Sequence, residues 1–197
     1  MQSTNQSRKA PSGVRIIAGR WRGRRLRLPP ASAVRPTPDR VRETVFNWLA
    51  PVLSGAACLD LYAGSGALAF EALSRGAARG VLVERDPALV AALEAMARLL
   101  GAEARIVAAD ARRFLQRPAR EAFDLAFLDP PYAEPLAPLL TGLRPWLAPA
   151  ALVYVERSRA EGLPALAGLQ WHRQARAGAV CYGLARLTGT GGYDEAG

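Results

Sequence analysis

A glycine turn between an apolar run and a helical pattern is the first place in the sequence where chemistry is expected. The stretch LDLYAGSGALAFEALSRGA, residues 59–77, passes through Gly64-Ser65-Gly66 into a helical pattern. Glycines let a ligand approach the backbone closely, and a helix N-terminus presents free N–H groups. Glu84 ends the next apolar run, where a carboxylate can accept hydrogen bonds from ribose hydroxyls. The pattern indicates an adenosine-containing cofactor, although a turn that only tightens strand–helix packing would read the same.

The carboxylate of Asp60 separates two classes of adenosine cofactor. Gly64-x-Gly66-x-x-Ala69 also satisfies the dinucleotide pattern, so the glycines alone leave NAD open. Asp60 lies four residues before Gly64, inside the expected strand. There it would repel a pyrophosphate and attract the cationic amino group of S-adenosylmethionine. The alternative for Asp60 is a buried carboxylate that only caps backbone N–H groups.

The tetrapeptide Asp129-Pro130-Pro131-Tyr132 follows the apolar run 123–128. Two prolines make a rigid turn, which presents a carboxylate and an aromatic ring where doubly wound sheets bind ligands. This pair suits methylation of an exocyclic base nitrogen. Asp129 and a carbonyl of the Pro130 turn would accept the two N–H bonds, and Tyr132 would stack on the extruded base. No strong base is needed, because the nitrogen becomes acidic once alkylated. A proline turn that merely ends a strand is the alternative.

Alternating strands and helices must position these residues. Short apolar runs at 58–62, 81–83, 106–109, 123–128 and 152–155 are typical of parallel strands buried on both faces. Helical patterns lie between and after them at 67–75, 87–100, 111–116 and 135–146. This order predicts an α/β fold, a doubly wound, Rossmann-like and mostly parallel sheet. Two last runs, 169–175 and 180–187, predict a C-terminal antiparallel hairpin.

The N-terminal part has a different character. Runs at 14–18 and 26–28 flank the turn GRWRGRR and predict a short basic hairpin. A helix should follow, with Thr37 as its N-cap and with one apolar face formed by Val41, Val45, Trp48, Leu49 and Val52. We therefore expect a tail at 1–13, a basic extension at 14–53, a methyltransferase domain at 54–187 and a flexible tail at 188–197.

The net charge of +9 is concentrated in this extension. Residues 1–50 carry 11 basic side chains against Asp39 and Glu43, while the rest of the chain is balanced. A neutral body with a basic arm indicates a polyanionic partner, although a solvated basic face is the simpler alternative. Trp21 among the arginines would stack either on a base or on an arginine. The side chains expected to bind RNA are Arg20, Arg22, Arg24, Arg25, Arg35 and Arg40.

Composition excludes several classes of protein. No apolar run reaches the ~18–20 residues of a membrane span, and the polar N-terminus predicts no signal peptide. Cys58 and Cys181 are expected to be reduced core thiols in the cytoplasm. With His172 as the single histidine, neither a histidine-based metal site nor a Ser/His/Asp triad is expected.

The glycine loop and DPPY, together with RIIAGRWRGRRL and RPTPDRVRETVFNWL, resemble the RsmD family. These are bacterial class I methyltransferases that act on the N2 of a guanine in 16S ribosomal RNA. The resemblance covers residues 14–187, and its two N-terminal segments are the specific part. It implies a seven-stranded sheet, S-adenosylmethionine as cofactor without a metal, and 16S rRNA in an assembling small subunit as partner. It also implies a cytoplasmic monomer.

Carried over residue by residue, the resemblance assigns a cofactor site and a catalytic site. The cofactor-binding set is Asp60, Gly64, Ser65 and Gly66 for the methionine part, Glu84 for the ribose, and Asp110 and Ala111 for the adenine. The catalytic set is Asp129, Pro130 and Tyr132. Asp110 could equally be the N-cap of the helix that follows. One departure is ALEAMARLLGA after Glu84, where relatives usually have an Asn.

Three other functions remain as alternatives. A DNA adenine-N6 methyltransferase would use the same tetrapeptide but usually carries a target-recognition insert, for which no gap here is long enough. An NAD-dependent oxidoreductase predicts a catalytic His, a Tyr-x-x-x-Lys motif or a substrate domain. A non-catalytic RNA-binding module of the ribosome would not need DPPY.

Overall fold

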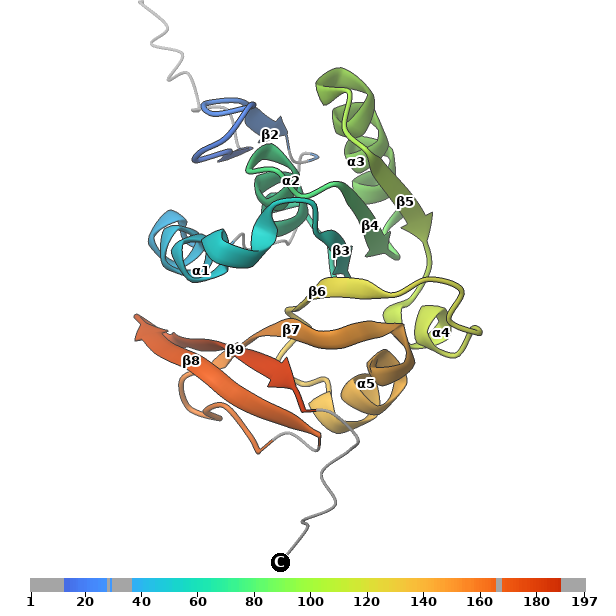
Figure 1. Cartoon of the computed structure of the whole chain (residues 1–197). Helices are drawn as coiled ribbons and strands as arrows, with labels where there is room; N and C mark the ends of the chain where they lie inside the picture. The colour runs from blue at the N-terminus through green and yellow to red at the C-terminus, as the bar shows by residue number, and fades with distance from the viewer. Residues whose placement is uncertain (1–12, 28, 30–36, 166–167, 189–197) are drawn as a thin grey trace, which may run out of the picture.

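A seven-stranded sheet forms the centre of the fold (Figure 1). The computed structural model describes residues 13–27, 29, 37–165 and 168–188. The strands lie in the order β5-β4-β3-β6-β7-β9-β8, and the first five are parallel while β9 runs antiparallel to β7 and β8. Their bounds are β3 Ala57–Asp60, β4 Arg79–Glu84, β5 Ala104–Ala108, β6 Phe123–Leu128, β7 Leu147–Ser158, β8 Leu169–Ala177 and β9 Val180–Leu187. The predicted parallel sheet and its C-terminal antiparallel hairpin are both confirmed.

Helices cover both faces of this sheet, as a doubly wound fold requires (Figure 1). One apolar core lies between the sheet and the helices α1, α2 and α3, and the other lies beneath α4 and α5. The bounds are α1 Asp39–Leu53, α2 Ala67–Ser74, α3 Pro87–Leu100, α4 Ala111–Leu115 and α5 Leu136–Leu143, with a 3-10 turn η1 at Arg144–Trp146. The carboxyl ends of the parallel strands therefore lie between two packed layers of helices.

Two elements have bounds that differ clearly from the predicted ones, and one strand differs in its burial. The helix expected at 135–146 ends at Leu143 and continues as η1. The strand expected at 152–155 runs from Leu147 to Ser158. The strand β5 is half-exposed rather than buried on both faces, because it forms one edge of the sheet and pairs only with β4.

The N-terminal hairpin is present as predicted, with shorter strands. β1 (Gly13–Arg15) and β2 (Arg25–Arg27) pair antiparallel, with Val14 opposite Leu26; the predicted end at Leu28 lies outside the described residues. Ile16, Trp21 and Leu26 are buried in the core shared with α1, α2 and α3. The hairpin is thus held to the sheet layer by its own apolar face.

A fully buried arginine ties the hairpin to α1. Arg42 donates from Nη2 to the Asp39 carboxylate at 2.7 Å and to the Arg15 carbonyl at 2.8 Å. From Nη1 it donates to Glu71 of α2 at 3.4 Å. Because a buried guanidinium needs anions and acceptors around it, Arg42 brings the hairpin, α1 and α2 together.

The carboxylate of Glu71 completes this contact from the side of α2. It is fully buried and accepts the backbone N–H groups of Ile17 at 2.7 Å and Ala18 at 3.0 Å. Arg75, one turn along α2, donates to it at 2.6 Å. We call Arg42 and Glu71 the buried ion pair. Nothing in the spacing of the two residues, 29 positions apart, predicted it.

Two predictions about α1 were wrong. Thr37 is not the N-cap, since the helix begins at Asp39 with Pro38 in the cap position and no side-chain cap. The Pro38 carbonyl instead accepts the first backbone bonds of the helix. Val52 is 48% exposed, while Phe46, which was not predicted, is fully buried and contacts Phe127 of β6. The buried face of α1 therefore includes Phe46 and Arg42 rather than Val52.

Candidate active site

The glycine loop connects β3 to α2 in the predicted way. Gly64 and Gly66 have φ of 52° and 74°, in the left-handed region that favours glycine. A Cβ at Gly66 would lie 2.6 Å from the ring of Phe70 and 2.8 Å from Leu93. Packing alone therefore requires glycine at position 66, in agreement with the alternative that the turn tightens the contact between strand and helix. Ser65 is buried between the two glycines.

Glu84, at the end of β4, is held beside this loop. One carboxylate oxygen, Oε2, accepts the N–H of Gly64 at 2.9 Å. The other, Oε1, accepts the N–H groups of Arg85 at 2.8 Å and Asp86 at 2.9 Å. These three backbone donors fix the orientation of a half-exposed carboxylate at the carboxyl end of the sheet.

Asp60, at the end of β3, is a buried carboxylate without a cation among the described residues. Its side chain is 3% exposed, and it takes part in no ion pair of the described chain. Burial raises the pKa of Asp60 to about 7, and Glu84 adds to the rise, while backbone hydrogen bonds from Tyr62 and Ala69 oppose it. A buried acid in this state fits a cationic ligand group, which would supply the missing partner.

The end of β5 presents a third carboxylate, on Asp110. It caps α4, accepting the backbone N–H groups of Arg112 at 3.0 Å and Arg113 at 3.2 Å through the same oxygen, Oδ1. The N-cap interpretation is therefore confirmed, and contact with an adenine remains a prediction. Ala111, the first residue of α4, is buried.

The DPPY turn follows β6 at the centre of the sheet. Burial raises the pKa of Asp129, and the carboxylates of Glu156 and Asp60 raise it further, while Arg157 lowers it. Asp129 thus lies close to Asp60, on the neighbouring strand β3. Tyr132 is 43% exposed, as a ring that receives a base should be. At the carboxyl ends of the parallel strands, the structure brings together the carboxylates that the sequence predicted for cofactor binding and catalysis.

Arg157 of β7, which the sequence did not single out, holds the DPPY turn in place. Its guanidinium donates to the carbonyls of Tyr132 at 2.6 Å, Glu134 at 3.2 Å and Pro131 at 3.5 Å. The carbonyl of Pro130 accepts no hydrogen bond from the described residues. Arg157 therefore fixes the turn while the Pro130 carbonyl stays available to a ligand.

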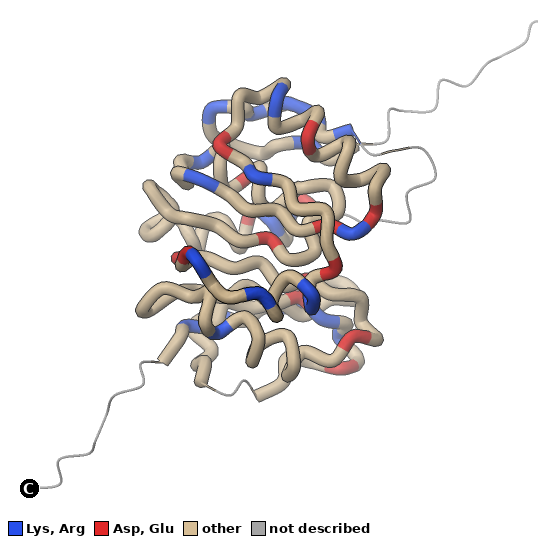
Figure 2. Tube along the Cα trace, turned by 90° about the vertical axis from the view of Figure 1, so that its right-hand side faces the viewer, with Lys and Arg blue, Asp and Glu red and all other residues tan. Residues whose placement is uncertain are grey.

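The arginines of the hairpin are exposed, and Figure 2 shows where Lys and Arg lie along the chain. Arg20 lies over the ring of Trp21, 4.0 Å from its centroid, and Trp21 is buried, so Trp21 stacks on an arginine rather than being open to a base. Arg22, Arg24, Arg25 and Arg40 are exposed and form no ion pair within the described part of the chain. Arg35 lies outside the described residues.

The hairpin also lies beside the glycine loop. Leu26 and Arg27 line a narrow crevice together with Gly64, Ser65 and four residues of α3. The hairpin and the glycine loop are therefore neighbours in the structure. The exposed tip of the hairpin, with Arg22 and Arg24, does not line the crevice.

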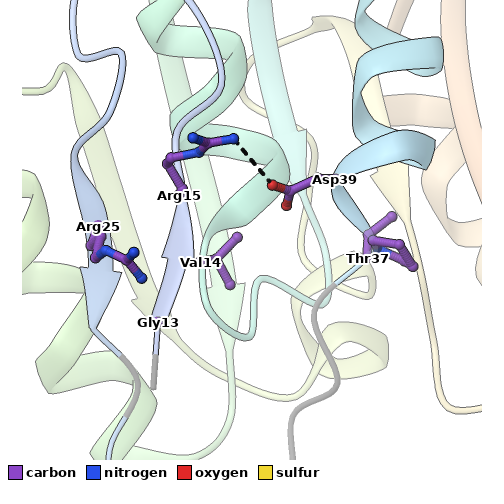
Figure 3. A pocket seen from close by; sticks show the side chains of 7 residues that line it. Gly13, Val14, Arg15, Arg25, Thr37 and Asp39 are labelled. Atoms are coloured by element: carbon purple, nitrogen blue, oxygen red, sulfur yellow. Dashed lines mark ion pairs between the residues drawn. The ribbon is translucent and has the colours of Figure 1, made fainter. Parts of the chain in front are cut away.

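A pocket of about 380 Å³ lies between the hairpin and the start of α1 (Figure 3). In Figure 3 Arg15 faces Asp39, at 3.8 Å between charged atoms. Arg25 lines the same pocket, but no predicted cofactor or catalytic residue does. The pocket is therefore separate from the carboxylates at the sheet edge.

Three further features bear on the excluded classes. Both cysteines are buried and free, as predicted. In the ranges that the structure describes, no cluster of three or more His, Cys, Asp or Glu side chains has the arrangement of a metal site. No helix there has the length and apolar character to span a membrane.

Comparison with known proteins gives a consistent result. Residues 14–186 match the profile of a family described as conserved hypothetical protein 95. The chain is 45% identical to "Ribosomal RNA small subunit methyltransferase D" of Escherichia coli K12, covering 92% of this chain and 93% of that protein. It is 42% identical to the protein of the same name from Haemophilus influenzae, over 78% and 83%. A solved structure titled as a putative methyltransferase from Escherichia coli superposes with a TM-score of 0.84 at 43% identity, covering 90% and 99%.

Proposed function

Because the chain belongs to the RsmD family of small-subunit rRNA methyltransferases, we propose that it transfers a methyl group from S-adenosylmethionine to the exocyclic N2 of a guanine in 16S rRNA. The observation that carries this proposal is the meeting of Asp60, Glu84 and Asp129 at one edge of the sheet. Asp60, which has no cation among the described residues, suits the amino group of the methyl donor. Glu84 suits its ribose, and Asp129 suits the amine that is to be methylated.

The residues present fit the methyl donor. Asp60 would pair with its ammonium group, and Gly64, Ser65 and Gly66 would lie along its methionine part. Glu84, already oriented by three backbone N–H groups, would accept from the ribose hydroxyls. Asp110 would use Oδ2, which does not take part in the helix cap, toward the adenine amino group beside Ala111. When bound, S-adenosylmethionine supplies an electrophilic methyl group.

The catalytic step falls to the DPPY turn. Asp129 and the unbonded carbonyl of Pro130 would each accept one N–H of the exocyclic amine, which favours a pyramidal nitrogen with its lone pair toward the methyl group. Tyr132 would hold the base by stacking, which is worth about 1–3 kcal/mol per base. As the nitrogen lone pair forms the new C–N bond, the S–C bond of the sulfonium would break and leave the neutral thioether S-adenosylhomocysteine. The alkylated nitrogen, now acidic, would then lose its proton to water. The roles of these three residues are orientation and charge stabilisation.

The exposed arginines of the hairpin, with Arg35 and Arg40, would bind the phosphates of the rRNA. Arginine forks match phosphate oxygens, and their clustering on one arm gives the protein a binding surface outside the active site. We further propose that the enzyme acts as a cytoplasmic monomer on an assembling small subunit, and that residues 14–53 and 54–187 are its two functional parts.

A methyl-transfer assay tests the proposed function. Small-subunit particles that lack the modification are incubated with the protein and tritiated S-adenosylmethionine, and the rRNA is then digested to nucleosides. Label in N2-methylguanosine is the expected result. Label in N6-methyladenosine, or transfer to DNA, would instead support the adenine methyltransferase. NADH binding without S-adenosylmethionine binding would point to an oxidoreductase.

A further inference from the structure

We propose that Glu156 accepts the N1–H of the target guanine and thereby makes the site selective for guanine over bases with a bare ring nitrogen at that position. This inference rests on the proposed guanine-N2 activity and adds a base-reading residue to it. Glu156 was not among the residues predicted from the sequence, and it belongs to β7, the strand beside the one that leads into the DPPY turn.

Strand register places Glu156 next to Asp129. β6 and β7 are parallel, with Phe127 opposite Tyr154 and Leu128 opposite Val155, so the next pair is Asp129 and Glu156. Neighbouring strands lie about 4.8 Å apart. The two carboxylates are thus adjacent at the carboxyl ends of their strands, where the ligand of a doubly wound sheet binds.

Both side chains also lie on the same face of the sheet. Phe127 and Tyr154 belong to the core beneath α1 and α2, with ring centroids 6.2 Å apart. Leu128 and Val155 belong to the opposite core. Since side chains alternate along a strand, Asp129 and Glu156 return to the face of Phe127 and Tyr154. A hydrogen bond from Tyr154 to Glu156 agrees with this placement.

Glu156 is held rigidly and has no cation of its own. It is 5% exposed, and the Tyr154 hydroxyl donates to its Oε2 at 2.7 Å. Among the described residues no other side chain hydrogen-bonds it, and the neighbouring Arg157 is engaged by Glu161 and by the DPPY turn. A buried carboxylate with spare acceptor capacity attracts a buried donor and disfavours another acceptor.

Guanine offers the matching donors. On its Watson–Crick edge the N2 amine is flanked by N1–H, so the two adjacent groups present donors in a row. With the amine held by Asp129, the N1–H would face the neighbouring carboxylate. Adenine has a bare N1 beside its amine, whose lone pair would face Glu156. Sites built to hydrogen-bond an N–H reject analogues that lack it by large factors.

The decisive experiment compares guanine with 2-aminopurine, which keeps the C2 amine but has a bare N1. Small subunits are assembled on 16S rRNA ligated to carry either base at the methylated position. We expect the wild-type protein to prefer guanine by about a hundredfold or more in kcat/KM. Glu156→Gln should reduce that preference at least about tenfold, because an amide can donate to a bare N1 as well as accept from N1–H.

Glu94→Gln, which removes an exposed carboxylate on α3, is the matched control and should keep the wild-type preference. Tyr154→Phe removes the donor that orients Glu156 and should also reduce the preference, so it decides the question if Glu156→Gln does not fold. The proposal is overturned if Glu156→Gln loses activity equally on guanine and on 2-aminopurine. It is also overturned if Glu156→Gln does not fold and Tyr154→Phe keeps the wild-type preference for guanine. The activity of the wild-type protein on guanine is measured in a separate assay. If the proposed function is wrong, that assay yields no N2-methylguanosine.

Discussion

At the scale of single residues, burial sets the protonation of Asp60. The pKa of Asp60 is about 7, far above the ordinary 3.8, because burial disfavours its charge. A raised carboxyl pKa stabilises the folded, ligand-free protein at low pH, and that contribution is lost as the pH rises from about 4 through 7. Binding of a cationic ammonium group has the opposite dependence, because it requires ionised Asp60.

We therefore predict that S-adenosylmethionine binds more tightly as the pH rises from 6 to 7.5. The ionised fraction of a group with this pKa grows roughly fivefold to tenfold over that range, and the affinity should follow. Calorimetric titration at several pH values measures it. Asp60→Asn should weaken binding and flatten the profile; a steep profile that survives in Asp60→Asn would assign the pH dependence to another group.

A second residue-scale prediction concerns Asp129. Asp129→Ala should lower kcat about a hundredfold to a thousandfold, since the variant loses an acceptor for the developing positive charge. Its affinity for S-adenosylmethionine should stay within about threefold, because its partner is the amine. Single-turnover kinetics and calorimetry on the same preparation measure both. Near-normal rates would remove the proposed mechanism.

The sequence predicted the acids that lie within or directly after short apolar runs. It missed two charged residues inside a longer strand. Asp129 directly follows the run 123–128, and Asp60 lies within the run 58–62 just before the glycine turn, so their place at the carboxyl ends of the strands could be foreseen. Glu156 and Arg157 lie within β7, whose charged end was interpreted as the end of the strand. They are accommodated there because Tyr154 and the DPPY carbonyls supply their hydrogen bonds.

At the scale of elements, helices with local signals were predicted most closely. α3 spans 87–100 as expected, because the Asp86 side chain caps its first N–H groups and Gly101 ends it in the left-handed region. α1 has no side-chain cap, and its buried face is set by contacts with the hairpin and α2. Such long-range contacts leave no local pattern in the sequence.

The buried ion pair of Arg42 and Glu71 leads to a prediction at this scale. Glu71→Gln should lower the free energy of unfolding by about 3–5 kcal/mol, because Arg42 loses a buried anion and stays charged. It should also loosen the backbone of the hairpin and so speed trypsin cleavage after its arginines, since Glu71 accepts the N–H groups of Ile17 and Ala18. Urea unfolding and limited trypsin digestion measure the two effects.

Glu94→Gln is the control for that experiment. Glu94 is exposed on α3, with its Arg98 partner 3.9 Å away, so its loss should change stability by less than about 0.5 kcal/mol. If Glu71→Gln were as stable as this control, the buried ion pair would not be what holds the hairpin. Faster trypsin cleavage without loss of global stability would assign Glu71 to local anchoring only.

At the scale of the whole molecule, the basic residues of the hairpin and the carboxylates beside the glycine loop form two different surfaces. The excess of basic residues lies in the first 50 positions, and the remainder is balanced. The hairpin that carries this excess turns its apolar side toward the sheet and touches the glycine loop through Leu26 and Arg27. The surfaces proposed for substrate and cofactor are therefore adjacent, yet they involve different side chains of the same hairpin.

This arrangement predicts that Arg22, Arg24 and Arg25 serve RNA binding alone. Changing all three to Glu should raise KM for the small-subunit particle at least about tenfold and reduce its salt dependence. For every phosphate that the protein no longer neutralises, the slope of log affinity against log salt should fall by about 0.7–0.9. Affinity for S-adenosylmethionine should be unchanged, because none of the three lines the crevice at the glycine loop.

The matched control reverses three exposed arginines of the body, Arg120, Arg173 and Arg176, which gives the same change of net charge. If the arm binds RNA, this control should keep KM within about threefold, because steering by net charge alone is screened over about 8–10 Å at physiological salt. Equal effects of the two triple variants would mean that total charge, rather than the arm, attracts the particle. A joint loss of particle and cofactor binding in the hairpin variant would make the hairpin a wall of the cofactor site, reached through Leu26 and Arg27, and would count against a separate RNA-binding arm.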